Sequence, residues 1–261
     1  MISQAIHPQA VIAPGAKLGA GVQVGAYAVI GEDVELGDAC ILHAHAVVQG
    51  PSRFGINNVF HPFCSIGAAP QDLKYRGEKT ELITGDNNVF RENVTVSRGT
   101  ARGGGKTTIG SGSLFMANAH VGHDCHIGDG TLFVNGATLA GHVDIEDFAT
   151  IGAFSPVHQF CRVGRYAYIG ACTVITQSVP PFSLVVTKRE TKCYGINTIG
   201  LERKGFSPER LKILRRAFRL LSRSKLNTSN ALEEMRKTLG DSADVQELIR
   251  FIEAAERGIV K

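Results

Sequence analysis

Histidines gather in one part of the sequence, and imidazole is the side chain best suited to moving protons near neutral pH. Five of them lie in the segment AHVGHDCHIG and after it: His120, His123, His126, His142 and His158. Asp124 follows His123 directly and could orient or polarise it, although neighbours in a strand point to opposite faces. Two chemistries fit these residues. One is general base catalysis, and the other is a zinc site of three histidines and a water molecule.

The element that must position these histidines is a repeat of six residues. Large apolar residues occupy every sixth position from Ile109 to Ile175 and from Ile12 to Ile66, with a small residue two positions earlier and often a glycine directly after. Six is a multiple of the strand period of two and matches neither a helix nor a heptad. Each repeat predicts a short strand and a tight turn. Because one repeat cannot bury its apolar face alone, the repeats must stack into a parallel β-helix.

Two segments interrupt the repeat and are expected to leave the coil as loops. Near 68–83, the charged residues Asp72 and Glu78 occupy slots for large apolar residues. Near 97–107, the segment SRGTARGGGKT shifts the count by one residue. Loops that leave a regular scaffold tend to carry function, so both are candidate parts of a site.

After Ile175 the repeat ends, and the rest of the chain has helical character. Consecutive prolines in QSVPP cannot donate to a strand ladder and are expected to end the coil. Capping residues and glycines then predict a helix from Pro208 to about Ser222, a second one capped by Thr228 or Asn227 that stops before Gly240, and a third over about 243–256. The chain is therefore expected to hold a β-helix over 1–187 and a small α-helical domain over 188–261.

The repeat also predicts where the histidines meet. If three hexads make one lap, residues 18 apart lie one above another, so His123 stacks on Gly141 beside His142, and His158 lies one lap further. None of these histidines occupies an apolar slot, so each is expected to point outward. The three imidazoles would then line one edge of the coil.

Composition and charge narrow the class of protein. The chain has 261 residues, is 43% hydrophobic and carries a net charge of +4, as expected of a globular protein. With neither a signal segment nor a membrane-spanning run, it is expected to stay in the cytoplasm, without stable membrane insertion. Four cysteines fill small slots of the repeat and are expected to be buried, reduced thiols: Cys40, Cys64, Cys125 and Cys161.

The basic residues are concentrated in one part of the chain. The segment 188–225 has twelve Lys or Arg against three Glu, a net charge of +9 that leaves −5 for the rest. This concentration favours an acidic partner, with a solvated helix face as the alternative. Nucleic acid is a weaker option, because the segment has few aromatic residues and no binding motif.

Several motifs resemble one known family over nearly the whole chain, in order. They are QDLKY (71–75), RGT (98–100), NAHVGHDC (118–125), NGATLAGHV (135–143), VHQFCRVG (157–164) and GLERKGF (200–206). These resemble the UDP-N-acetylglucosamine O-acyltransferases, hexapeptide-repeat enzymes that open lipid A synthesis. The resemblance implies a left-handed β-helix, a hand that periodicity cannot give. It also implies a homotrimer with active sites between subunits, no cofactor, and transfer of an R-3-hydroxyacyl chain from acyl carrier protein to the 3-hydroxyl of the UDP-sugar.

The resemblance also implies roles for individual residues. His123 matches the general base, Asp124 its helper, and the Gly141 amide the oxyanion donor. The positions that match substrate contacts are Asp72, Lys74, His120, His142, His158, Gln159, Asn197 and Arg203. Tyr168 and Ala171 are the expected lining of the acyl groove, and acyl carrier protein is the acidic partner expected for the basic segment.

The sequence departs from the family at two positions, and three alternatives stay open. Ile199 stands where the family often has a glutamate facing the nucleotide, and Ser97 replaces a frequent histidine.

Several acyl lengths remain compatible with the groove, and the acceptor can be the ordinary sugar or a 3-amino variant. A related N-acyltransferase would need an extra domain before Ile12. A zinc enzyme of the carbonic anhydrase type shares the coil and three histidines but does not need QDLKY, and a purely structural β-helix leaves the outward histidines unexplained.

Overall fold

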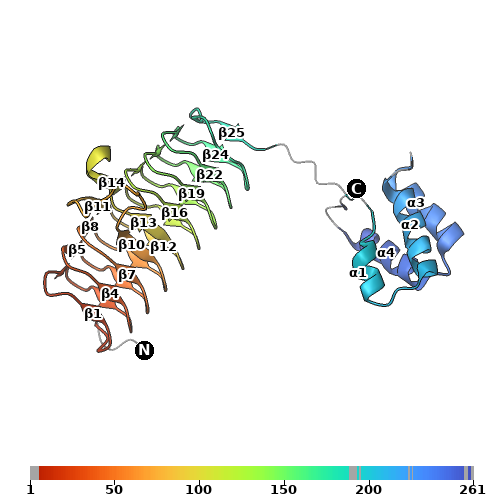
Figure 1. The fold of residues 1–261 in the computed structure, drawn as a ribbon, viewed down its shortest axis with the longest axis horizontal. Coiled ribbons are helices and arrows are strands. Elements are labelled where there is room, and N and C mark those ends of the chain that lie inside the picture. The colour runs from red at the N-terminus through yellow and green to blue at the C-terminus, as the bar shows by residue number, and fades with distance from the viewer. Residues whose placement is uncertain are drawn as a thin grey trace. The chain divides into compact units, whose positions relative to one another are not determined.

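The chain forms two compact units, Met1–Thr187 and Lys188–Lys261. The structure, a computed structural model, describes residues 6–187, 193, 195–222, 224, 226–255 and 258–259. In the first unit the chain winds into a solenoid whose laps stack along one axis (Figure 1). Each hexad contributes one short strand, and every third strand along the chain joins the same sheet.

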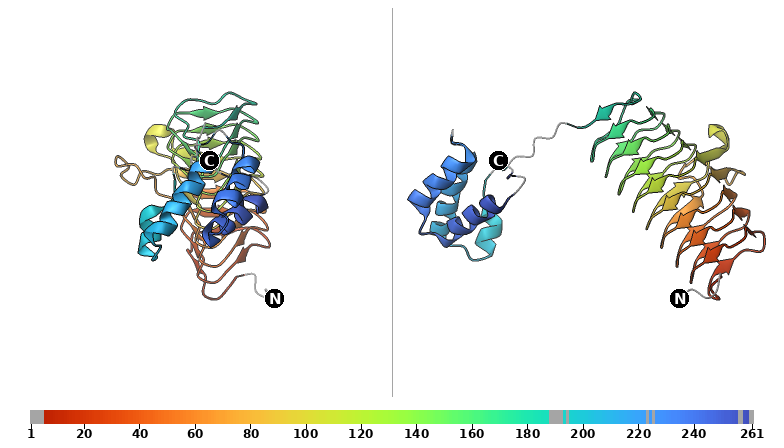
Figure 2. Two further views of the ribbon diagram at one scale, coloured as in Figure 1. Left: turned by 90° about the vertical axis from the view of Figure 1, so that its right-hand side faces the viewer. Right: turned by 180° about the vertical axis from the view of Figure 1, so that it is seen from behind.

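Three parallel sheets form the sides of the solenoid within the described residues. Sheet I contains β1 (Val11–Ile12), β4 (Val29–Ile30), β7 (Val47–Val48), β10 (Ser65–Ala68), β13 (Thr95–Ser97), β16 (His120–Val121), β19 (Thr138–Leu139) and β22 (Pro156–Val157). Sheet II contains β2 (Lys17–Leu18), β5 (Val34–Leu36), β8 (Ser52–Phe54), β11 (Glu81–Thr84), β14 (Lys106–Ile109), β17 (His126–Ile127), β20 (Asp144–Ile145) and β23 (Arg162–Val163). Sheet III contains β3 (Gln23–Val24), β6 (Ile41–Leu42), β9 (Val59–Phe60), β12 (Val89–Phe90), β15 (Leu114–Phe115), β18 (Leu132–Phe133), β21 (Thr150–Ile151), β24 (Tyr168–Ile169) and β25 (Leu184–Val185). The stacked laps are also visible from behind in Figure 2.

The large residues of the hexads point inward and stack from lap to lap. Phe60, Phe90, Phe115 and Phe133 are fully buried, and their rings stack at centroid distances of 5.3, 5.1 and 4.7 Å. Burying one such side chain contributes roughly 1.5–3 kcal/mol. A repeated identical contact therefore fixes the register of every lap, and with it the position of each corner.

Both predicted loops leave the solenoid, but they are shorter than the sequence suggested. The first spans 69–80 rather than 68–83, because Leu82 is buried and pairs with β8 and β14. The second spans 98–105 rather than 97–107, because Thr107 is buried in β14. It contains the 3-10 turn η1 (Ala101–Gly103).

The consecutive prolines Pro180 and Pro181 do not end the coil, contrary to the prediction from the sequence. They lie in a corner, where no ladder donor is required, and β25 follows them and pairs with β24.

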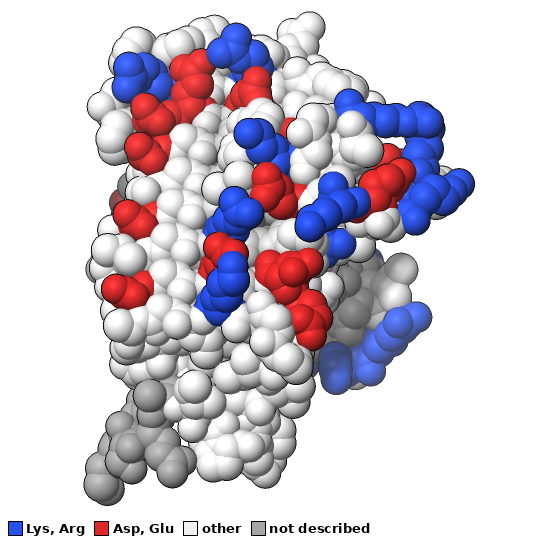
Figure 3. All heavy atoms as spheres, turned by 90° about the vertical axis from the view of Figure 1, so that its left-hand side faces the viewer, with Lys and Arg blue, Asp and Glu red and all other residues white. Residues whose placement is uncertain are grey.

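The outer faces of the three sheets differ in chemistry. Outward positions of sheet II carry charges that pair across laps, as Lys17 does with Glu35 at 2.7 Å and Arg162 with Asp144 at 3.7 Å. Figure 3 views the molecule from the side of β5 and β8 and shows both signs interspersed. Apolar side chains fill the outward positions along the middle of sheet III: Ile41, Val59, Val89, Leu114 and Leu132. On sheet I, Val11, Val29 and Val47 face outward.

The second unit contains four α-helices within its described residues. They are α1 (Thr198–Arg203), α2 (Pro208–Ser222), α3 (Thr228–Leu239) and α4 (Ala243–Ala254). The three longer helices match the predicted ones and share an apolar core. The sequence analysis did not predict α1, which is short and begins after the capping residue Asn197. Among the described residues, no helix is both long and apolar enough to cross a bilayer.

Candidate functional site

One edge of the solenoid carries most of the residues that the sequence singled out. At this edge the chain turns from sheet I to sheet II, and both inserted loops leave it there, between β10 and β11 and between β13 and β14. In the next three laps the same turn spans 122–125, 140–143 and 158–161. We call these three turns the histidine corner, because they hold His123, His142 and His158. The predicted stacking of laps thus brings the three histidines to one edge.

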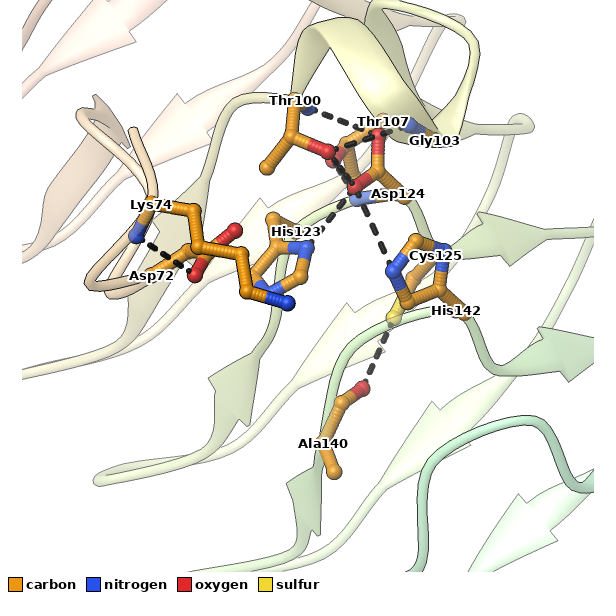
Figure 4. A network of polar contacts seen from close by, with 10 residues as sticks. All are labelled: Asp72, Lys74, Thr100, Gly103, Thr107, His123, Asp124, Cys125, Ala140 and His142. Carbon is orange, nitrogen blue, oxygen red and sulfur yellow. Dashed lines mark hydrogen bonds and ion pairs between the residues drawn. The ribbon is translucent and has the colours of Figure 1, made fainter. Parts of the chain in front are cut away.

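His123 and Asp124 form a hydrogen-bonded pair (Figure 4). The Nδ1 atom of His123 lies 2.7 Å from Oδ2 of Asp124. Neighbouring side chains can meet here because both residues lie in a turn, and Asp124 has a left-handed backbone with φ of 58°. In a strand the two would point apart. An ionised carboxylate can only accept, so Nδ1 carries the proton and Nε2 keeps its lone pair in the neutral ring.

The carboxylate of Asp124 is buried beneath the second loop. Its side chain is 1% exposed, and its two oxygens accept hydrogen bonds from the backbone N–H and the hydroxyl of Thr100, each at 2.7 Å. The amide of Asp124 donates to Oγ1 of Thr107 at 2.8 Å. Gly103 lies so close that a Cβ there would come within 2.1 Å of the carboxylate. The carboxylate is therefore held on two sides by the same loop.

The next lap places Gly141 and His142 against this pair. A Cβ on Gly141 would come within 2.6 Å of Cε1 and 2.8 Å of Nε2 of His123, so the imidazole lies directly over the Gly141 backbone. Among the described residues, no hydrogen bond engages the Gly141 N–H. The His142 ring contacts the His123 ring edge-on at 5.1 Å and stacks on Phe160 at 4.7 Å. An available amide donor thus lies beside a candidate base.

The remaining histidines differ in their surroundings. His120 lies on the outer face of β16, with Nδ1 2.7 Å from Oγ1 of Thr95. Burial, and to a lesser degree the charge of His123, lowers the pKa of His120, which favours its neutral form. His158 is exposed, and its Nδ1 lies 3.1 Å from the carbonyl of Gln159, which is exposed as well.

The first loop carries Asp72 and Lys74 and is tied to the second loop by Arg98. Oδ1 of Asp72 accepts from the Lys74 amide at 2.9 Å. Arg98 is buried and donates to the carbonyl of Gly67 at 2.7 Å and to the hydroxyl of Tyr75 at 3.2 Å. The RGT motif predicted no role for Arg98 or Thr100 by itself and entered only through the family resemblance. The burial of an arginine would have marked this loop as functional, but burial becomes visible only in the folded structure.

Other predicted residues are not part of the three turns of the histidine corner. Tyr168 is half exposed on the outer face of sheet III, and Ala171 lies in the turn that follows β24. Asn197 caps α1 through its side chain, and Arg203 is the last residue of that helix, so both belong to the second unit. Their roles stay predictions.

The predicted basic segment 188–225 is only partly described. Residues 188–192, 194, 223 and 225 lie outside the described residues. On α2, five basic residues are exposed: Arg210, which pairs with Asp244, and Lys212, Arg215, Arg216 and Arg219.

The ligand atoms of His123, Asp124 and His142 lie within 4.8 Å of one another, which raises the possibility of a metal site. The distances do not fit zinc. Two ligands on one tetrahedral zinc lie about 3.4 Å apart, given bonds of roughly 2.1 Å. The Nδ1 to Oδ2 distance of 2.7 Å is a hydrogen bond, and Oδ2 also accepts from Thr100. His123 Nδ1 and Asp124 Oδ2 are therefore hydrogen-bonded to each other and are not two ligands of one zinc ion.

The buried cysteines form no part of this site. All four predicted thiols are free and buried. Burial raises the pKa of Cys64 and of Cys125 to about 12. Cys125 directly follows Asp124, yet its thiol points into the core and donates to the carbonyl of Ala140 at 3.2 Å. A neutral thiol of this kind is not a nucleophile.

Comparison with known proteins gives one consistent result. The family model for domain 2 of UDP-N-acetylglucosamine O-acyltransferase matches residues 179–260, and the bacterial transferase hexapeptide model matches 15–50 and 106–141. The chain is 45% identical to the acyl-[acyl-carrier-protein]–UDP-N-acetylglucosamine O-acyltransferase of Xylella fastidiosa over 98% of this chain and 97% of that protein. It is 46% identical to the Halorhodospira halophila enzyme of the same name, over 98% and 99%.

Solved structures agree with the sequence matches. LpxA from Acinetobacter baumannii is 39% identical, covers 99% of this chain and 100% of its own, and superposes with a TM-score of 0.70. UDP-N-acetylglucosamine acyltransferase from Arabidopsis is 34% identical over 98% and 100%, with a TM-score of 0.61. The predicted fold class, a left-handed parallel β-helix followed by a small helical domain, is confirmed.

Proposed function

This chain belongs to the acyl-[acyl-carrier-protein]–UDP-N-acetylglucosamine O-acyltransferase family, and we propose that its histidine corner performs the acyl transfer. The acyl group is an R-3-hydroxyacyl chain on acyl carrier protein, and the acceptor is the 3-hydroxyl of UDP-N-acetylglucosamine, in the first step of lipid A biosynthesis. The observation that carries the proposal for this site is the 2.7 Å contact between His123 and Asp124. It presents Nε2 as a base of fixed orientation.

The reaction follows from the positions of three groups. Nε2 of His123 takes the proton of the sugar hydroxyl, whose oxygen attacks the thioester carbonyl carbon. The oxyanion that forms accepts a hydrogen bond from the Gly141 N–H, a donor that stabilises the charge as it develops. Collapse of the intermediate breaks the C–S bond, and Nε2 returns its proton to the sulfur of the leaving thiolate. Asp124 supports the positive charge on His123 between these two transfers.

The substrate contacts are proposed from the surroundings of the corner. Asp72 and Lys74, on the loop that leaves the corner two laps earlier, are proposed to bind the sugar. Burial lowers the pKa of His120, which favours the neutral ring, and a neutral ring can accept or donate a hydrogen bond without adding charge beside His123. His142 contacts His123 edge-on, His158 and Gln159 lie exposed one lap further, and all three are proposed as substrate contacts. Asn197 and Arg203 are proposed as nucleotide contacts, and the fork of Arg203 suits two phosphate oxygens.

We propose that the protein acts as a homotrimer. The apolar outward positions on the first three strands of sheet I and along the middle of sheet III flank one edge of the solenoid, whereas sheet II is charged and suited to water. Packing sheet III of one copy against sheet I of the next closes a ring by a heterologous contact. Tyr168 and Ala171 of one copy then border the groove that begins at the histidine corner of its neighbour. The acyl chain would lie in that groove.

A pair of matched variants tests the trimer. Leu114→Glu puts a charge on the apolar face of sheet III, and Lys106→Glu changes the charge of an exposed residue on sheet II. Light scattering after gel filtration should give three times the 27.9 kDa of one chain for the parent protein and for Lys106→Glu. Leu114→Glu should give a smaller mass. A parent protein of 27.9 kDa in dilute solution would refute the trimer.

The acidic carrier protein is proposed to dock on the basic surface of α2. Lys212, Arg215, Arg216 and Arg219 are exposed there. An association of this type weakens as salt is added, so the KM for the carrier thioester should rise with ionic strength while the KM for the sugar nucleotide changes less.

The buried free thiols fit a reducing compartment, and we place the reaction in the cytoplasm.

The direct test of the function is a transfer assay with the full chain. Carrier-protein thioesters of several lengths are offered with UDP-N-acetylglucosamine and, separately, with its 3-amino analogue, and the product is identified by mass. His123→Ala should abolish turnover. The matched control is His126→Ala, because His126 is exposed on sheet II and its ring hydrogen-bonds, among the described residues, only to the hydroxyl of Thr108. Turnover of His123→Ala within a few-fold of the parent rate would show that His123 is not the base.

A further inference from the structure

The Asp124 carboxylate has hydrogen-bond partners in the second loop to which the proposed mechanism assigns no role. A carboxylate with 1% exposure has to find its hydrogen-bond donors inside the protein, because the cost of burying an unpaired charge is several kcal/mol. Nε2 of His142 lies 3.8 Å from Oδ2, beyond hydrogen-bond distance. Apart from His123, the hydrogen-bond donors to the carboxylate oxygens come from one residue. Thr100 donates its backbone N–H to Oδ1 and its hydroxyl to Oδ2, both at 2.7 Å.

The hydroxyl of Thr100 is itself held in place. Its oxygen accepts a hydrogen bond from the Gly103 amide at 3.1 Å and caps η1. The hydroxyl proton is therefore left for Asp124, the only remaining acceptor that it contacts in the described chain. The conformation of the second loop thus fixes the direction of this hydrogen bond.

The second loop is an addition to the solenoid at this one corner. Thr95 of β13 and its partner His120 of β16 are 25 residues apart, whereas His120 and its partner Thr138 in the next lap are 18 apart. The seven additional residues build η1 over the Asp124 carboxylate. Gly103 closes the loop from the other side, because any Cβ there would collide with the carboxylate oxygens.

We propose that Thr100 is a positioning residue, which holds the Asp124 carboxylate so that it fixes the tautomer and orientation of His123. The proposal rests on the proposed function, in which His123 is the base. Thr100 does not touch substrate. It acts through Asp124, and the chain Thr100, Asp124, His123 runs from the inserted loop to the reacting nitrogen (Figure 4).

Two variants of the same residue separate the hydroxyl from the shape of the side chain. Thr100→Val keeps the volume and the backbone N–H but removes the hydroxyl, whereas Thr100→Ser keeps the hydroxyl. A general base contributes typically 10²–10⁴-fold, so a disoriented base should lose part of that factor. We expect kcat to fall about 10–100-fold in Thr100→Val with little change in either KM, and to stay within about threefold of the parent in Thr100→Ser.

A spectroscopic readout tests the same claim without substrate. A proton held between Nδ1 of His123 and a carboxylate gives a downfield imidazole N–H resonance, which should be visible in the parent and in Thr100→Ser and should broaden or disappear in Thr100→Val. His123→Ala assigns the resonance. If the parent protein shows the resonance but has no transferase activity, the proposed function fails while the role of Thr100 is still tested by this signal.

A third variant covers the case in which Thr100→Val does not fold. Gly103→Ala retains the Thr100 hydroxyl and presses a methyl group on the carboxylate, so it should also lower kcat with an unchanged KM and weaken the resonance. The proposal is overturned if Thr100→Val, or Gly103→Ala in its place, folds with parent kcat and an unaltered resonance. It is equally overturned if Thr100→Ser loses as much activity as Thr100→Val, because the hydroxyl would then not be the group that matters.

Discussion

Gly141→Ala is expected to inactivate the enzyme by moving the imidazole of His123. A Cβ on residue 141 would lie 2.6 Å from Cε1 of that ring, and ordinary contacts begin at 3.4 Å, so the ring must shift by about 0.8 Å. The backbone of Gly141 does not have the positive φ that only glycine adopts readily, so the methyl group itself causes the effect. The amide donor also remains in place.

The size of the effect follows from this displacement. A misplacement of about 1 Å at a reacting group can cost roughly 10²-fold, or about 2.7 kcal/mol of transition-state stabilisation. His123 has little freedom to yield, because Nδ1 is tied to a carboxylate that is itself held by Thr100. We therefore expect kcat/KM of Gly141→Ala to fall about a hundredfold.

The assay compares initial rates of acyl transfer for the parent, for Gly141→Ala and for a matched control. Gly31→Ala serves as the control, because a Cβ there meets its nearest atom at 3.5 Å, an ordinary contact, and the backbone φ is again not positive. It should leave kcat/KM unchanged. Gly141→Ala with parent activity and an unaltered melting temperature would mean that the position of the imidazole is not critical, and the role of His123 would have to be reconsidered.

Three further outcomes are expected. Arg98→Gln removes the cation that ties the first loop, through the Tyr75 hydroxyl, to the Gly67 carbonyl of β10, so the KM for the sugar nucleotide should rise several-fold more than the KM for the carrier thioester; equal changes in both would contradict this. Because burial raises the pKa of Cys64 and Cys125 to about 12, neither should react with iodoacetamide at pH 8 until denaturant is added, as mass spectrometry can show. The hydrogen bond from Arg210 lowers the pKa of Asp244, so this pair stabilises the helical unit above the ordinary Asp pKa of about 4 and is lost as pH falls below it. Asp244→Asn should therefore reduce the acid sensitivity of unfolding of that unit, and an unchanged pH dependence would refute the assignment.

The solenoid could be predicted from sequence because its cause is local and repeated. Phe115 and Phe133 occupy the same slot of successive laps, and both are fully buried as the spacing requires. The same arithmetic placed His123 over Gly141. The hand of the coil could not be obtained in this way, since a period of six fits either hand, and it came from the family resemblance.

The details of the site depended on backbone geometry that spacing does not encode. Asp124 can reach His123 only because the turn adopts a left-handed backbone, whereas strand alternation would have separated them. Thr100 is distant from Asp124 in sequence, and only the folded loop brings its hydroxyl to the carboxylate. The loop ends were misplaced because Leu82 and Thr107 returned to the core sooner than the interrupted count indicated.

Both inserted loops leave the solenoid at the corner that holds the histidines, and this has a consequence for how such a protein can vary. A corner can take up extra residues with little change to the sheets on either side, because the flanking strands still pair with their neighbours, with one register shift between β10 and β13 at Ile66 and Ala68. The number of residues in a turn at this edge can therefore change while the sheets keep their arrangement. New specificity can be tried there by lengthening, shortening or exchanging a loop while the stacked aromatic column continues to set the position of every lap.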